Sequence, residues 1–252
     1  MTEAKTETAA KEVVKSPGRL MRFLRARLDP KSYLGLHFTV GLVLVVLTLW
    51  LFGGLLEEVL DNATLVRWDM SAAARIHAMA TPLGLSVFHA ITNIGSPPVM
   101  TSLAVIGVAT LLVMRWRLLA LVWIAAAGGG AILDQVLKIL VHRTRPEYGA
   151  AFLHGVSYSF PSGHAMGSLI GFGMVAFAIA HVRHLSRRER QVAYWLAGLA
   201  TLLVGLSRVY LGVHYPSDVV GGWAAGGAWL SICITGYHFV TGRAAHLHPE
   251  SP

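Results

Sequence analysis

The chain has 252 residues, of which 54% are hydrophobic and 13% are charged, against roughly 25% charged in typical soluble domains. The mean hydropathy is +0.57 and the apolar residues form long uncharged runs, which exclude an ordinary soluble globule and indicate a polytopic membrane protein. The formal net charge is +8, but the basic residues lie between the apolar runs, where they set membrane orientation, so we expect no nucleic-acid binding.

Residues 1–31 form a basic tail with eight lysines and arginines. From Arg19 onward, apolar residues recur at helical spacing between the arginines, as in a helix that lies on an anionic membrane surface. A solvated basic tail fits this segment equally well. Residues 32–56 carry no charge and are long enough to cross the hydrocarbon layer, so we predict the first span there.

Prolines interrupt the next apolar stretch at Pro82, Pro97 and Pro98. We therefore expect only residues 94–114 in the membrane, after an outer connection over residues 57–89. Four further spans are predicted over residues 118–141, 163–182, 191–207 and 219–241. The expected fold is all-α, with a six-span domain over residues 32–241 and a short tail over residues 242–252.

Six spans place both termini on the same side of the membrane. Fifteen of the 21 Lys and Arg residues fall on that side, which the positive-inside rule predicts to be cytoplasmic. We expect a multi-pass protein of a bacterial-type inner membrane with both termini in the cytoplasm. The other six basic residues are then expected at the extracytoplasmic face: Arg67, Arg75, Lys138, Arg143, Arg145 and Arg208.

Three of these outer cations lie at predicted span ends, where a positive charge needs an anionic partner or water. Lys138, Arg145 and Arg208 provide one ammonium and two guanidinium groups, which suit the oxygens of a phosphoryl group. Ser162 and Gly163 begin a predicted helix at the same face, where free N–H groups add contacts for an anion. The sequence therefore predicts a phosphate site at this face.

Two histidines at the same face supply the remaining chemistry. Asp218 follows His214 by four residues and can orient its imidazole and stabilise the charged form, so we assign His214 as the nucleophile. His164 lies at the predicted helix start, and we assign it as the general acid that protonates the leaving oxygen. Taken alone, each histidine is typical of an interfacial residue; together with the cations they predict catalysis.

These segments resemble the motifs of the type 2 phosphatidic acid phosphatase superfamily. The family pattern is Lys, six residues, Arg-Pro; then Pro-Ser-Gly-His; then Ser-Arg, five residues, His, three residues, Asp. All eleven fixed residues occur in this order between Lys138 and Asp218. The resemblance implies hydrolysis without a metal or another cofactor through a phosphohistidine at His214, with His164 as the acid. It implies that phosphate is held by Lys138, Arg145, Ser162, Gly163 and Arg208.

Three polar neighbours stay outside this assignment. Asp134 lies one helical turn before Lys138, and it either pairs with that lysine or faces a polar cavity. His142 and Arg143 lie beside the first motif and could contact a second phosphate, but we expect them to be solvated loop residues.

Glycines repeat every four residues along two predicted spans, a spacing that allows helices to approach closely. The stripes could pack within one bundle or between two copies, so the oligomeric state stays open. Their members are Gly163, Gly167 and Gly171, and then Gly222 and Gly226.

The expected function is hydrolysis of a lipid phosphate or diphosphate at the outer face of the membrane. Undecaprenyl diphosphate is the favoured substrate because the resemblance extends to small six-span bacterial members of the family; phosphatidylglycerophosphate, phosphatidate and a lipid A phosphate are the alternatives. Transfer of the phosphoryl group to another lipid or to a sugar would use the same residues. An anion transporter is the remote alternative, because the charges cluster at one face.

Overall fold

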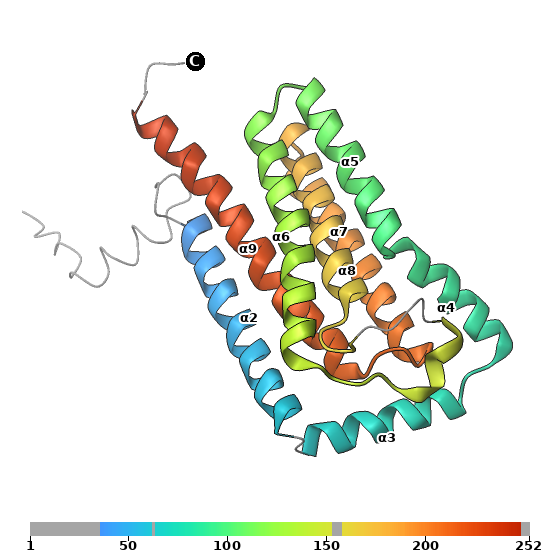
Figure 1. Cartoon of the computed structure of the whole chain (residues 1–252). Helices are drawn as coiled ribbons and strands as arrows, with labels where there is room; N and C mark the ends of the chain where they lie inside the picture. Colours follow the sequence, from blue (N-terminus) through green and yellow to red (C-terminus); the bar gives the residue numbers. More distant parts are fainter. Residues whose placement is uncertain (1–35, 62–63, 153–157, 248–252) are drawn as a thin grey trace, which may run out of the picture.

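The computed structural model describes residues 36–61, 64–152 and 158–247 (Figure 1). The regular elements in these ranges are all helical, as expected. They are α2 (Leu36–Leu60), α3 (Thr64–Ala78), α4 (Pro82–Ile94), α5 (Pro97–Val113), α6 (Arg117–Val141), the short 3-10 helix η1 (Glu147–Phe152), α7 (Gly163–Val182), α8 (Arg187–Tyr210) and α9 (Pro216–Leu247). The expected surface helix of the basic tail lies outside the described residues.

Six helical segments in the described ranges are long and apolar enough to cross a membrane, by length and composition. This number confirms the predicted six spans. Four candidate spans begin within a few residues of their predicted positions or at them. The six are Phe38–Leu60, Pro82–Val113, Arg117–Val141, Gly163–Val182, Arg187–Tyr210 and Pro216–Gly242.

The predicted start of the second span was wrong. Helices α4 and α5 follow each other with only Gly95 and Ser96 between them, and together they form the candidate span Pro82–Val113. Each helix has a proline in its first turn, where the missing N–H removes no helical hydrogen bond. The prolines therefore begin helices within the span. Since α2 also continues to Leu60, the outer connection shortens to residues 61–81 and consists largely of α3.

Helix α7 is the centre of the bundle and packs against α6, α8 and α9. The buried core beside it contains Trp123, Met166, Ile170 and Phe177. On α9, a Cβ added at Gly222 would lie 2.6 Å from the carbonyl oxygen of Ser162, at the start of α7. The glycines of α9 therefore allow the close approach to α7 that their spacing predicted.

Helix α3 crosses one end of the bundle, where α6 and α8 end and α7 and α9 begin (Figure 1). It contacts both α8 and α9, and its buried residues are Asp69 and Ala73. Helix α2 packs along α9 on the outside of the bundle. The fold therefore gathers four helix termini, the loops between them and α3 at a single end.

Candidate active site

The eight residues assigned from the sequence all lie at the end of the bundle that α3 crosses. Arg145 lies 2.9 Å from the ring of His214, and a Cβ added at Gly163 would lie 2.9 Å from Nζ of Lys138, so segments far apart in the sequence converge on one site. Lys138 and Arg208 lie in the last turns of α6 and α8, and Asp218 lies in the first turn of α9. Ser162, Gly163 and His164 lie at the start of α7. Arg145 and His214 lie in the loops that follow α6 and α8.

The imidazole of His214 is fully buried and has different partners at its two nitrogens. Its Nδ1 lies 3.5 Å from Oδ2 of Asp218 and 3.4 Å from Oγ of Ser159. Its Nε2 lies 2.9 Å from Nη1 of Arg145. A guanidinium only donates, so Nε2 accepts and the ring proton is assigned to Nδ1, facing Asp218. This arrangement leaves the lone pair of Nε2 directed at the cationic part of the site.

Burial in the loop before α9 lowers the pKa of His214 to about 3; the hydrogen bond to Asp218 opposes this shift, and the positive charge of Arg145 adds to it. The imidazole is therefore neutral near pH 7. Neutral imidazole is the form that can attack phosphorus, because protonation would occupy the lone pair of Nε2.

The carboxylate of Asp218 is fully buried and held from several directions. It accepts a hydrogen bond from the hydroxyl of Ser159 and another, at 2.8 Å, from the backbone N–H of Tyr215 just before α9, as in a capping box. Nη1 of Arg143 donates to its Oδ1 over 2.6 Å. Ser159 and Arg143 lie outside the sequence assignment, because neither belongs to a motif at fixed spacing.

The expectation that Arg143 is a solvated loop residue was wrong. Its side chain is 8% exposed and forms ion pairs with Asp69 at 2.8 Å and with Asp218 at 2.6 Å. Although burial lowers the pKa of this guanidinium, the two carboxylates raise it above its ordinary value. His142 is exposed, ends α6 in a left-handed conformation and contacts the ring of Tyr158 edge-on.

The residues assigned to phosphate include a lysine that already has a carboxylate partner. Nζ of Lys138 lies 2.6 Å from Oδ2 of Asp134, so Asp134 forms the ion pair that the sequence left open, and it also lines a cavity. A Cβ added at Gly163 would lie 2.9 Å from this Nζ and 3.0 Å from the same Oδ2. Only glycine allows the start of α7 to approach the pair so closely.

Two hydrogen-bond donors at this site are buried without a partner in the described part of the chain: Oγ of Ser162 and Nε of Arg208. The guanidinium of Arg208 is held from α4, since its Nη1 donates to Oγ1 of Thr92 over 2.9 Å. Buried donors left over in this way are costly unless they bind an anion or water. Together with Lys138 and Arg145 they suit phosphate oxygens.

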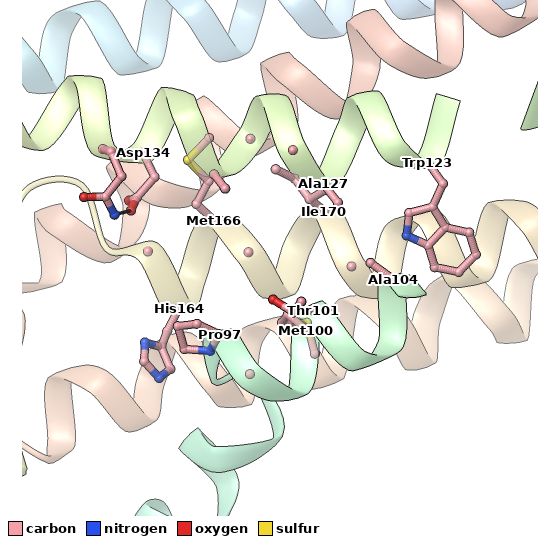
Figure 2. A pocket seen from close by; sticks show the side chains of 18 of the residues that line it. Pro97, Met100, Thr101, Ala104, Trp123, Ala127, Asp134, His164, Met166 and Ile170 are labelled. Atoms are coloured by element: carbon pink, nitrogen blue, oxygen red, sulfur yellow. Dashed lines mark hydrogen bonds between the residues drawn. The ribbon is translucent and has the colours of Figure 1, made fainter. Parts of the chain in front are cut away.

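An apolar cavity of about 390 Å³ begins at this site and extends between α5, α6 and α7 (Figure 2). His164 and Asp134 lie near one end of it and Trp123 near the other. Gly167 lines the cavity, and a Cβ there would meet no atom within 4 Å. This glycine of α7 therefore widens the cavity and does not serve the helix packing predicted for it.

Comparison with known proteins identifies the family. A sequence profile described as the PAP2 superfamily matches residues 117–241. Phosphatidylglycerophosphatase B of Bacillus subtilis is 38% identical over 141 residues, which cover 56% of this chain and 68% of that protein. The chain belongs to the PAP2 superfamily of membrane lipid phosphatases. The family that the three motifs resemble is thereby confirmed.

Other PAP2 proteins extend this comparison. The crystal structure of a transmembrane PAP2-type phosphatidylglycerolphosphate phosphatase from B. subtilis superimposes with a TM-score of 0.67 at 28% identity, covering 77% of this chain and 94% of that one. An undecaprenyl-diphosphatase of Sulfolobus acidocaldarius is 37% identical over 75 residues, 29% of this chain and 31% of that protein. The PAP2 protein described here is thus a multi-pass membrane protein.

Proposed function

We propose that this PAP2 protein hydrolyses a lipid phosphate or diphosphate through a phosphohistidine at Nε2 of His214. The observation that carries the proposal is the position of that ring: Nδ1 faces the buried carboxylate of Asp218 and Nε2 faces Arg145, at 2.9 Å. The remaining cations and the unpartnered donors of Ser162 and Arg208 support a phosphoryl group in front of Nε2.

In the first step, Nε2 of His214 forms a bond to phosphorus while the bond between phosphorus and the leaving oxygen breaks. Protonated His164 gives its proton to that oxygen, which leaves as a lipid alcohol or a lipid phosphate. Asp218 stabilises the positive charge that develops on the ring of His214.

In the second step, a water molecule gives a proton to the now neutral His164 and attacks phosphorus. The bond between phosphorus and Nε2 breaks, and inorganic phosphate and the free imidazole of His214 are formed. We propose that the reaction needs no metal, because Lys138, Arg145 and Arg208 balance the charge of the transferring group.

The cavity supports a lipid as the substrate. It begins at His164 and Asp134 and continues along α5, α6 and α7 between mainly apolar side chains and glycines. A hydrocarbon chain attached to the phosphate fits this lining, whereas a water-soluble phosphate ester would leave it unused.

Three substrates are candidates. Phosphatidylglycerophosphate is supported by the B. subtilis relatives, which match this chain over most of their own length. Undecaprenyl diphosphate, favoured from the sequence, is supported by the S. acidocaldarius relative over a shorter segment. We place phosphatidylglycerophosphate first, since its relatives resemble this chain over more residues and in three dimensions. Lipid A phosphate is supported by a lipid A 1-phosphatase of Rhizobium etli, which is 35% identical over 129 residues and matches about half of each chain.

We propose that the site opens to the outside of a bacterial-type inner membrane and that both termini are cytoplasmic. Most of the basic residues that the structure describes outside the site lie near the opposite ends of the spans, which supports this orientation through the positive-inside rule. They are Arg115, Arg117, Arg183, Arg187, Arg188, Arg190 and Arg243.

Phosphate release by the detergent-purified protein in EDTA tests the function. Phosphatidylglycerophosphate, undecaprenyl diphosphate, phosphatidate and a water-soluble phosphomonoester are compared, with His214→Ala as the inactive control. We expect the wild-type protein to release phosphate from one of these lipids and the His214→Ala variant to release none. Undiminished release by the variant would contradict the assignment of His214. Phosphate found on an acceptor lipid or sugar, with little free phosphate, would establish a transferase.

A further inference from the structure

Asp69 is a fully buried carboxylate on a helix that is otherwise largely exposed. It lies on α3, where the only other buried residue is Ala73, and its exposed fraction is 0%. It precedes all three motifs and also precedes the residues that the family profile matches. A carboxylate is rarely buried to this extent unless it is paired, so its partners indicate why it is there.

One partner of Asp69 is the first turn of α9. Its Oδ1 accepts a hydrogen bond from the backbone N–H of Ser217 over 3.1 Å, and its Oδ2 accepts one from the Ser217 hydroxyl. Ser217 is the second residue of α9 and directly precedes Asp218. The carboxylate of one helix therefore caps the N-terminus of another, where its charge also matches the helix dipole.

The other partner is Arg143, which lies between two buried carboxylates. Nη2 donates to Oδ2 of Asp69 over 2.8 Å, and Nη1 donates to Oδ1 of Asp218 over 2.6 Å. The guanidinium also lies over the ring of Tyr215, 4.4 Å from its centroid. The planar fork of arginine suits this bridge, because it directs separate N–H groups at the two carboxylates.

The charges of this network decide what Asp218 can do for His214. On the Nδ1 side of the imidazole, opposite Arg145, the two carboxylates and the guanidinium of Arg143 carry a net charge of about −1. Without the charge of Asp69, Arg143 would neutralise Asp218 alone. The positive charge that develops on His214 during phosphorylation would then be less well stabilised.

We infer that Asp69 is a positioning residue for the catalytic histidine: through Arg143 and the first turn of α9, it fixes Asp218 against His214 and keeps that carboxylate effectively negative. The inference rests on the proposed function. It makes α3, the helix that crosses the end of the bundle, part of the active site.

Asp69→Asn tests this inference, since asparagine is nearly isosteric and can still accept from Ser217. We measure kcat and KM with a lipid phosphate, and the thermal midpoint, for the wild-type protein and for the variants Asp69→Asn and Asp69→Glu. Asp61→Asn, which removes an exposed carboxylate of the same connection, is the matched control. We expect Asp69→Asn to lower kcat by about 10- to 100-fold, the size of effect found for residues that orient metal-binding histidines, with KM within about threefold. Asp69→Glu should recover part of the loss.

A second variant separates this role from a purely structural one. Arg143→Lys keeps the charge but lacks the planar fork that directs separate N–H groups at Asp69 and Asp218, so it should reproduce the loss of kcat. Combining it with Asp69→Asn should lower kcat by less than about a further threefold. A kcat of Asp69→Asn equal to that of wild type would overturn the inference, and so would a loss that merely follows the folded fraction. Wild-type protein that releases no phosphate would instead overturn the proposed function, so the two failures are distinguishable.

Discussion

At the scale of single residues, the two nitrogens of His214 have opposite surroundings. One faces the carboxylate of Asp218 and the other faces the guanidinium of Arg145. The ring is neutral in the folded protein because burial lowers its pKa to about 3. This shift has a consequence for stability that can be measured without substrate.

We expect the thermal midpoint of the unliganded protein to fall on acidification, in part because of His214. Between the ordinary histidine pKa of 6.5 and the folded value of about 3, the unfolded chain binds a proton that the folded protein does not. The contribution of neutral His214 to the stability of the folded protein is therefore complete above pH 6.5 and is lost as the pH falls toward 3.

His214→Gln should reduce the fall of the midpoint between about pH 7 and pH 5. Equal slopes for wild type and His214→Gln would contradict a neutral, buried His214.

The residues of the site differ in how far the sequence could indicate them. The sequence indicates Lys138, Arg145 and Arg208 because a cation at a span end needs an anionic partner or water. Fixed spacings also connect these cations with the histidines. Asp69 and Arg143 lack such a signal: one acid in an amphipathic segment and one arginine in a loop are usually solvated. Asp69 and Arg143 form an ion pair only because the folded chain brings α3 against α9.

At the scale of helices, the number of spans followed from the apolar runs, whereas the start of the second span did not. A proline disrupts a helix interior but is well tolerated in the first turn, and Pro82 and Pro97 take up that position in α4 and α5. The sequence alone does not separate these two cases. The same holds for the glycines of α7, whose spacing predicts packing although Gly167 lines a cavity.

Gly222→Ala should destabilise the contact between α9 and α7. Its Cβ would lie 2.6 Å from the carbonyl oxygen of Ser162, a backbone atom that cannot move without shifting the start of α7. We expect a loss of about 1 to 3 kcal/mol in unfolding free energy, as for an overpacked core, and lower phosphatase activity.

The matched control is Gly236→Ala, on the same helix, where an added Cβ meets no atom within 4 Å. Unfolding in detergent and phosphate release are measured for both variants. Equal stability of the two would show that α7 and α9 are not packed as closely as described.

At the scale of the whole molecule, the bundle has two chemically different ends. The site, α3 and the exposed Asp61 lie at one end. The loop between α7 and α8 and the exposed Arg188, in the first turn of α8, lie at the other. In the proposed orientation, which follows the distribution of basic residues, the first of these ends faces the outside.

Cysteine labelling in intact cells tests this orientation. In a Cys233→Ser background, Asp61→Cys should react with a membrane-impermeant maleimide, because position 61 is exposed at the end of the bundle that we propose to lie outside. Arg188→Cys should react only after lysis. The reverse pattern would place the active site in the cytoplasm.

Trapping of the covalent intermediate tests whether the phosphoryl group is transferred to His214. An activated phosphate ester needs little help from a general acid, so His164→Ala protein should form the intermediate and, lacking the group that activates water, hydrolyse it slowly. After rapid quenching, peptide mass spectrometry should locate phosphate on His214, and none should be found in His164→Ala/His214→Ala protein. Phosphate on another residue, or full turnover without any covalent intermediate, would contradict the account.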